Sequence, residues 1–158
     1  MQASEFDEIA FFKGIERSGV RALLIGRRAL VVLGLPVLTA DYDFWIHVDD
    51  IALFNAAAES FGLLPTHTPE EARQRGRYVL QNDETVDVLV ARSLTAADGG
   101  RLAFDELWLR RRSVSLEEGV SVSIPSLDDL IATKRVRPRP KDLEDIRLLE
   151  ALRGVEPE

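Results

Sequence analysis

The spacing of apolar residues along the chain predicts several amphipathic helices. Over residues 4–17, Phe6, Ile9, Phe12 and Ile15 recur every three residues, so they would form the buried stripe of a first helix. Glycine, proline and capping residues mark the ends of the other helical segments. These segments are expected at 27–35, 51–61, 104–107 and 127–136, with Ser126 as a cap, and from Pro140 onward.

Strand patterns fill the stretches between these helices. In the segment 41–48, bulky apolar side chains alternate with a second set of residues that includes two acids. This two-residue alternation is typical of a strand, whose successive side chains point to opposite faces. The first set is Tyr42, Phe44 and Ile46, and the second is Asp41, Asp43, Trp45 and His47. Further strands are expected at 21–25, 111–116 and 120–124, and as a hairpin of 76–80 with 85–91.

Alternating helices and strands without a long linker indicate a mixed α/β (α+β) domain. The 158 residues suit one domain. We expect that domain to span 1–153, followed by a short tail over 154–158. A chain of this size buries about two-thirds of its unfolded surface, so it needs no disulfide or structural metal to fold.

Composition narrows the functional classes. The chain has no cysteine, which excludes disulfides, thiolate metal sites and cysteine nucleophiles and fits a reducing, cytoplasmic setting. Its net charge of −7 argues against a general nucleic-acid coat, though not against a local basic groove. The acidic start is unlike a signal peptide, and no apolar run approaches the length of a membrane helix. We therefore expect no membrane partner.

The segment 23–46 combines features that suit a nucleotide and a metal ion. An apolar strand runs into Gly26, where the missing side chain lets a ligand approach the backbone. A helix follows at once, and its first amides can receive a phosphate. Asp41 and Asp43 are two apart on a strand, so both carboxylates face one side. Paired carboxylates acting together with substrate phosphates are the usual ligands of Mg²⁺.

Asp87 adds a third acid in a second predicted strand. Its neighbours Val86 and Val88 make it costly to bury without a cation or a hydrogen-bond donor. The residue is therefore a candidate third metal ligand, or a base for an attacking hydroxyl.

These residues resemble the signature of the nucleotidyltransferase superfamily. In that signature a glycine and a small residue precede an Asp-apolar-Asp pair. Here Gly26-Arg27 is followed by thirteen residues and then Asp41-Tyr42-Asp43, with Thr39 just before the pair. The later stretch 124–152 resembles the end of minimal bacterial nucleotidyltransferases, including relatives of the toxins of AbiE-type toxin–antitoxin pairs. The residues that match there are Lys134, Lys141, Asp142 and Asp145.

The resemblance implies a nucleotidyltransferase fold, with a mixed central sheet flanked by helices and further helices at the C-terminus. It implies transfer of a nucleotidyl group from a nucleoside triphosphate (NTP) to an RNA, protein or small-molecule acceptor, and an antitoxin protein as a candidate partner. Asp41, Asp43 and Asp87 would be the catalytic residues and would hold two Mg²⁺ ions. The nucleotide-binding residues would be Gly26, Arg27, Thr39, Lys134 and Lys141.

Arg27 stands where the superfamily has a small residue. Its side chain could fill the phosphate site, which would leave a protein that binds a nucleotide or a partner without catalysis. It could instead supply a cation to the phosphates. The sequence leaves both possibilities open.

Plainer interpretations compete for the other candidates. Asp41 and Asp43 could be a solvated strand edge, and Asp87 could pair with Arg77. Lys134 could complement the negative end of its helix, and the two later acids, Asp142 and Asp145, are most simply helix-start acids. His47 could rim the site, although a structural role fits it better. The basic run 108–112 could contact RNA or form a charged strand edge.

Overall fold

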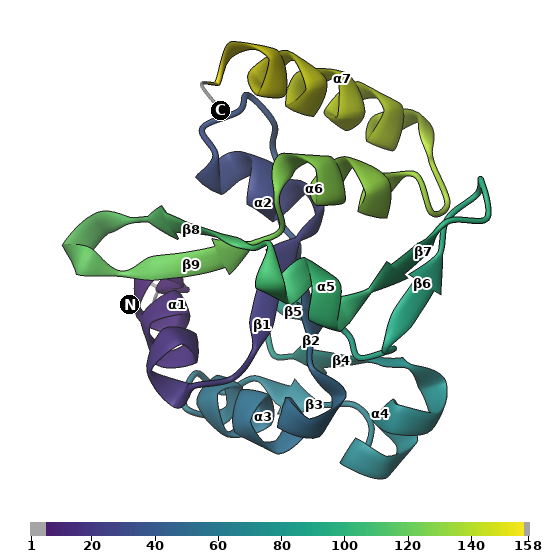
Figure 1. The fold of residues 1–158 in the computed structure, drawn as a ribbon. Helices are drawn as coiled ribbons and strands as arrows, with labels where there is room; N and C mark the ends of the chain where they lie inside the picture. Colours follow the sequence, from purple (N-terminus) through teal and green to yellow (C-terminus); the bar gives the residue numbers. More distant parts are fainter. Residues whose placement is uncertain (1–5, 157–158) are drawn as a thin grey trace.

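A mixed five-stranded sheet forms the centre of the molecule (Figure 1). The computed structural model describes residues 6–156. The strand order is β1-β2-β5-β4-β3. Only β2 and β5 run parallel, and the other neighbours are antiparallel. The strands are β1 (Ala22–Ile25), β2 (Tyr42–Ile46), β3 (Leu64–Pro65), β4 (Arg77–Gln81) and β5 (Thr85–Leu89). The expected mixed α/β class is confirmed.

The larger core lies on the sheet face that carries Phe44. There α1 (Glu8–Ser18) and α3 (Ile51–Glu59) pack against each other and against the sheet. Phe11 and Phe12 of α1 and Phe54 of α3 are almost fully buried around Phe44. The prediction that Tyr42, Phe44 and Ile46 share one face of their strand is confirmed, because all three are buried in this core.

A second, smaller core covers part of the opposite face. Trp45 is completely buried there together with Leu23, under Phe104 and Leu107 of α5 (Phe104–Leu109). Trp45 shares this face with Asp43, as the alternation predicted. The part of this face that carries Asp43 lies beyond this core and lines a cavity.

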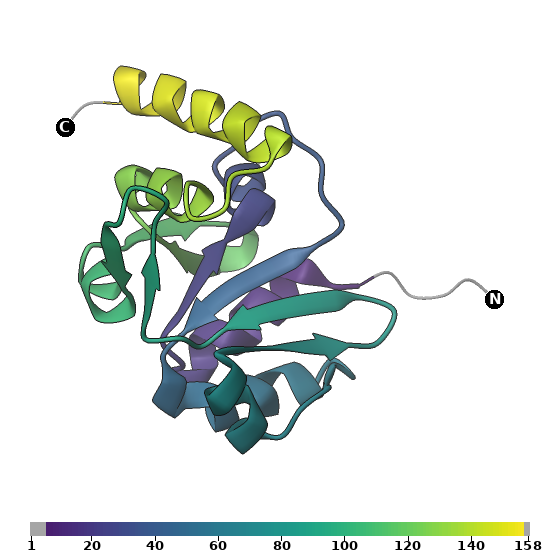
Figure 2. The same cartoon turned by 90° about the vertical axis from the view of Figure 1, so that its right-hand side faces the viewer.

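Three helices form a layer at one end of the sheet. In two perpendicular views, α2 (Gly26–Val32), α6 (Leu127–Lys134) and α7 (Pro140–Val155) lie together (Figures 1 and 2). The opposite end carries α3 and α4 (Pro69–Arg75). The predicted hairpin 111–124 is confirmed as β8 (Arg112–Ser115) with β9 (Ser121–Ile124), and β9 packs against β1 and α1.

Several element boundaries differ from the prediction. The first helix begins at Glu8, because the side chain of Asp7 accepts a hydrogen bond from the Ala10 amide and caps it; positions 4 and 5 lie outside the described residues. The second helix ends at Val32. The last helix continues to Val155, so its final turn includes the first two residues assigned to a tail.

Four of the strands and α-helices have no counterpart in the sequence prediction. These are the short edge strand β3, helix α4 and the hairpin of β6 (Ser93–Thr95) with β7 (Arg101–Ala103). Helix α4 carries a signal that could have identified it, since Thr68 and Glu71 form a reciprocal capping box around Pro69. No helix in the described part of the chain is long and apolar enough to cross a membrane.

Candidate active site

The sheet register places two of the predicted acids side by side. Asp43 of β2 is the direct parallel partner of Asp87 in β5, so the two side chains stand on one face of neighbouring strands. On its other side, Asp43 pairs with Ile25, the last residue of β1. Two acids from distant parts of the sequence therefore lie side by side near the junction of β1 and α2.

Gly26 makes room for the Asp43 carboxylate. Its backbone has φ of 68°, a conformation that side chains disfavour. A Cβ atom at this position would stand 2.5 Å from Asp43 Oδ2, well inside van der Waals contact. Glycine is thus required here both by the backbone turn and by the neighbouring acid.

We expect Gly26→Ala to displace the Asp43 carboxylate and to destabilise the protein by about 1–3 kcal/mol, through backbone strain and overlap. Calorimetric titration should show weaker Mg²⁺–NTP binding, and urea unfolding should show the stability loss. Gly34→Ala is the matched control, because Gly34 also has a positive φ of 83° but nothing lies within 4 Å of its added Cβ. Equal nucleotide binding by the two variants would contradict the steric role of Gly26.

Asp41 lies just before β2, on the loop that returns from α2. Its amide donates a hydrogen bond of 3.1 Å to Thr39 Oγ1. Arg28 fixes the same loop, because its guanidinium donates to the carbonyls of Thr39 and Asp41 and stacks over the Tyr42 ring. The exposed Asp41 carboxylate is therefore carried by a braced backbone. Sequence reasoning missed this function of Arg28.

The electrostatics of the acids show that they act on one another. Burial, followed by the charges of Asp87 and Asp41, raises the pKa of Asp43 to about 6. Burial is also the main cause that raises the pKa of Asp87, opposed by Arg77 and reinforced by Asp41. Carboxylates that repel one another in a partly dry site are stabilised by a cation.

These residues fit the chemistry of a hard divalent ion. Carboxylate oxygens from Asp41, Asp43 and Asp87 are the ligands that Mg²⁺ prefers, with waters and substrate phosphates completing its shell. Within residues 6–156, no three such side chains are gathered tightly enough to enclose a metal ion by themselves.

Two adjoining hollows open beside the acids. The larger has a volume of about 610 Å³ and lies between the sheet and the α6–α7 layer. Its charged lining residues are Arg27, Asp41, Asp43, Arg77, Lys134, Arg137, Arg139, Lys141 and Asp142. The smaller, of about 120 Å³, is bordered by Asp43, Asp87 and Arg77. Asp43 belongs to both hollows, whereas Asp41 lines only the larger and Asp87 only the smaller.

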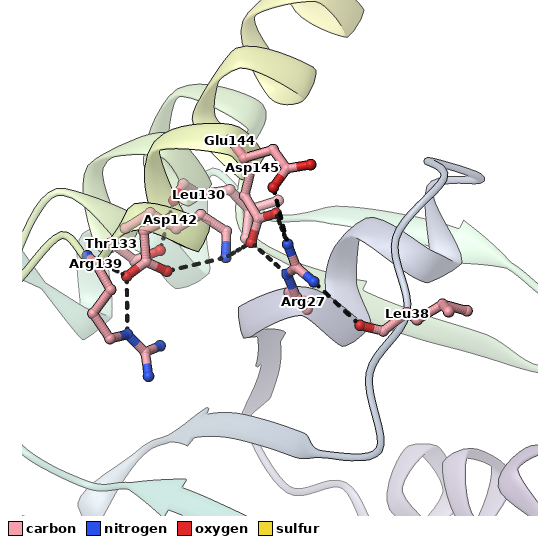
Figure 3. A network of polar contacts seen from close by, with 9 residues as sticks. Arg27, Leu38, Leu130, Thr133, Arg139, Asp142, Glu144 and Asp145 are labelled. Atoms are coloured by element: carbon pink, nitrogen blue, oxygen red, sulfur yellow. Dashed lines mark hydrogen bonds and ion pairs between the residues drawn. The ribbon is translucent and has the colours of Figure 1, made fainter.

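Asp145 is the centre of a buried ion-pair network behind Arg27 and Lys134, which line the larger hollow (Figure 3). Its side chain is fully buried and accepts a hydrogen bond of 3.0 Å from Lys134 Nζ. Arg27 approaches the same carboxylate with Nε at 3.1 Å from Oδ2 and Nη2 at 3.1 Å from Oδ1. The Oδ1 atom makes no well-aligned hydrogen bond with a described residue. One carboxylate therefore holds two cations.

This network settles the direction of the Arg27 side chain. The guanidinium points toward α7, where it lies between Asp145, Glu144 and the Leu38 carbonyl (Figure 3). Although Arg27 also lines the larger hollow, its charged group is engaged on the α7 side. The phosphate-filling orientation that the sequence left open is not the one adopted.

Asp142 and Asp145 differ from each other. Asp142 does act at the helix start, because its carboxylate accepts from the Arg139 amide and completes a capping box. The same interpretation is wrong for Asp145, which is a buried partner of Lys134 and Arg27. Lys134 is likewise buried between these two acids rather than free at its helix end. Lys141 lines the larger hollow.

The arginines of the basic run 108–112 are mostly engaged in contacts within the protein, two of them with acids far along the chain. Arg110 makes a two-point hydrogen-bonded pair with Asp129, and Arg112 makes another with Glu156. Arg111 stacks on Trp108. The run therefore braces α5, β8 and the C-terminal helices, and the idea of an RNA-binding patch finds no support.

Two further sequence candidates can now be placed. His47 is buried, and its Nδ1 accepts from the Asp49 amide at the start of a helical turn. Its Nε2 lies 3.6 Å from Asp105 outside both hollows, so its role is structural. Arg77 makes no ion pair with Asp87 at contact distance in the described chain, although its charge opposes the rise in the pKa of that acid.

Comparison with known proteins relates the fold to solved structures alone. No family model matches the chain, and neither does any curated protein sequence. Among solved structures, the lincomycin-bound lincosamide antibiotic adenylyltransferase LnuA matches with a TM-score of 0.64 and 14% identity, over 94% of this chain and 99% of that one. The antibiotic-resistance factor ANT(2'')-Ia matches with a TM-score of 0.63 and 16% identity, over 92% and 81%.

A third neighbour comes from Thermotoga maritima. TM1012, whose nucleotidyltransferase assignment is itself provisional, matches with a TM-score of 0.58 and 16% identity, over 91% of this chain and 86% of that one. The similarity extends over nearly the whole described chain in every case. The chain therefore has the nucleotidyltransferase fold that its sequence predicted.

Proposed function

We propose that this protein is a metal-dependent nucleotidyltransferase that moves a nucleotidyl group from an NTP to a hydroxyl acceptor. The observation that carries the proposal is the placement of Asp43. It pairs with Asp87 in the sheet, approaches Gly26 at the start of α2, and lies on the boundary between the two hollows. The nucleotidyltransferase fold of the solved neighbours supports the same conclusion.

The residues of the larger hollow suit the triphosphate. Asp41 and Asp43 would hold two Mg²⁺ ions, one of them shared with Asp87, and the ions would supply charge neutralisation and a lowered pKa of the attacking hydroxyl. Gly26 and Arg27, the first residues of α2, line this hollow. Lys134 and Lys141, together with Thr39, border the same space. Fixed cations here would stabilise the charge of the leaving pyrophosphate.

Asp87 suits the acceptor side of the reaction. It faces the smaller hollow, where its carboxylate could accept the proton of an acceptor hydroxyl. An acceptor hydroxyl in that hollow would lie between Asp87 and Asp43. The hydroxyl proton would pass to Asp87 as its oxygen attacks the α-phosphate, and pyrophosphate would leave toward the larger hollow.

The solved neighbours provide candidates for the acceptor class. Two of the solved neighbours are connected by name with antibiotics, one with bound lincomycin and one in a complex with adenylyl-2''-tobramycin. A small-molecule acceptor is therefore a candidate here, beside RNA or protein. A toxin-like role with an antitoxin partner rests on the sequence resemblance alone.

A labelled-nucleotide assay tests the proposed activity. Each NTP, labelled at its α-phosphate, is incubated with Mg²⁺, the protein and pooled candidate acceptors, and pyrophosphate release is measured in parallel. We expect label transfer and pyrophosphate release with the wild type and neither with Asp41→Ala plus Asp43→Ala. Equal turnover in both proteins would show that these carboxylates are not catalytic.

The alternative function is a non-catalytic nucleotide-binding or partner-binding protein. Its motivation was Arg27, and the direction of that side chain argues against a blocked site. We expect Arg27→Ser, which restores a small residue, to change the dissociation constant of Mg²⁺–ATP by less than about threefold, because the guanidinium is turned toward Asp145. A gain of tenfold or more on calorimetric titration would show instead that Arg27 obstructs the phosphates.

A further inference from the structure

The two hollows divide the candidate site into unlike halves. Gly26, Asp41, Lys134 and Lys141 border the larger one, which is the half that suits a triphosphate. The smaller half contains Asp87 and no residue of α6 or α7. Asp43 and Arg77 are the charged residues common to both. The smaller hollow therefore adjoins the larger one and lies in front of the acid that we assign to the acceptor hydroxyl.

Arg77 has a defined place in the smaller hollow. It stands on β4 in register with Leu89, and the next residue on its face, Val79, is in register with Asp87. Its exposed side chain thus projects from the same sheet face as Asp87, one step along the strands. It makes no ion pair with any residue between 6 and 156.

The other cationic side chains of the site have acidic partners or border only the larger hollow. Arg27 and Lys134 share Asp145, and Arg139 pairs with Asp142. Arg137 and Lys141 border only the larger hollow, where a triphosphate needs counter-charge. Arg77 alone of the six lining cations also borders the hollow of Asp87. It is therefore the cation available to an acceptor.

Each carboxylate of the site likewise has an assigned role. Asp41, Asp43 and Asp87 are the proposed metal ligands and base, and Asp142 caps α7. No further carboxylate lines either hollow in the described chain. An acceptor that carries several amines would find no free acid to neutralise it, although the protein as a whole has a net charge of −7. With Asp43 and Asp87 engaged by Mg²⁺, Arg77 would be the remaining charge on the lining of the smaller hollow and would oppose such an acceptor.

We propose that the smaller hollow is the acceptor subsite and that Arg77 makes it selective for a hydroxyl compound that carries a phosphate. This inference rests on the proposed nucleotidyl transfer and specifies its acceptor class. The guanidinium would receive the phosphate oxygens while the hydroxyl lies between Asp87 and Asp43. A sugar phosphate and the 3′-end of an RNA share this chemistry.

The test measures acceptor binding to the protein loaded with Mg²⁺ and a non-transferable NTP analogue. The probes are ribose, ribose 5-phosphate, a five-nucleotide RNA with a free 3′-hydroxyl, and tobramycin as a polyamine. We expect at least one phosphate-bearing probe to bind about tenfold or more tightly than both ribose and tobramycin. The RNA and the sugar phosphate then distinguish the two sources of phosphate. Equal or tighter binding of ribose or tobramycin would overturn the proposal.

Variants separate contact with the acceptor from an indirect effect on Asp87. Arg77→Gln should weaken the phosphate-bearing probe about tenfold and leave ribose within about twofold. Arg73→Gln, an exposed arginine of α4 outside both hollows, is the matched control and should change neither. Equal losses for ribose and its phosphate in Arg77→Gln would overturn the contact. Failure of the wild type to bind the Mg²⁺–NTP analogue itself would instead contradict the proposed function.

Discussion

Asp43→Asn is expected to abolish nucleotidyl transfer and, at the same time, to make the metal-free protein more stable. The activity should fall by about 10³-fold or more, because the residue faces both hollows and its charge is needed for metal binding. The free energy of unfolding should rise by about 1–3 kcal/mol at pH 7.5, because a partly buried, mutually repelled charge is removed. An activity assay and urea unfolding in chelator measure the two effects.

The pH dependence gives the sign of the stability effect. Because the pKa of Asp43 is raised to about 6, the folded state holds a proton that the unfolded chain has already lost. The stabilisation from that proton is complete below the unfolded pKa of about 4 and is lost as the pH rises through about 6. Unfolding in chelator should therefore show falling stability over this window in the wild type. Asp43→Asn should lack that decrease.

Asp83→Asn serves as the control for this experiment. Asp83 lies exposed in the turn between β4 and β5, outside both hollows. Its substitution should change neither activity nor the pH profile. A wild type and an Asp43→Asn variant with identical pH–stability curves would mean that neither burial nor the neighbouring acids raise the pKa of Asp43 in the folded protein.

Asp145→Asn should cause the largest loss of stability among the site variants, about 3–5 kcal/mol. Lys134, with a side chain only 5% exposed, and the half-buried Arg27 would lose their shared negative partner and remain beside each other. Urea unfolding at pH 7.5 measures the loss. In contrast, Asp128→Asn removes an exposed pair with Arg153 and should cost less than about 1 kcal/mol.

A double substitution tests whether the loss comes from the stranded cations. The double variant Lys134→Met plus Asp145→Asn should lose less free energy of unfolding than the sum of the two single variants. The reason is that the double change removes the buried ammonium group together with its carboxylate partner. Strict additivity would show that Asp145 stabilises the fold by another route. The same variants should weaken Mg²⁺–NTP binding, since Lys134 would no longer be held beside the larger hollow.

The fold class and the candidate acids could be recognised in the sequence, because their signals are local or follow from the two-residue period of a strand. The spacing of Asp41 and Asp43 predicted a common side on one strand, but β2 begins at Tyr42 and leaves Asp41 on the loop before it. The apolar flanks of Asp87 predicted its place within a strand, which is β5. The exact register that pairs Asp43 with Asp87 depends on the order of strands in the sheet, which neither segment encodes by itself. Gly26 was recognised as a close-approach site, although its nearest neighbour proved to be Asp43.

The tertiary ion pairs could not be predicted from the sequence. Asp145 has the features of a helix-start acid, and only the packing of α7 against α2 and α6 makes it a buried partner for Arg27 and Lys134. The direction of Arg27 follows from the same packing. The run 108–112 was equally ambiguous, because its acidic partners come from residues 129 and 156.

The most direct test of the account is a crystal structure with Mn²⁺ and a non-transferable NTP analogue. Anomalous scattering locates Mn²⁺ independently of the protein atoms. We predict two peaks beside Asp43, both within ligand distance of its carboxylate, with Asp41 and the triphosphate completing one site and Asp87 the other. A bound triphosphate with no anomalous peak at these three carboxylates would contradict the central claim.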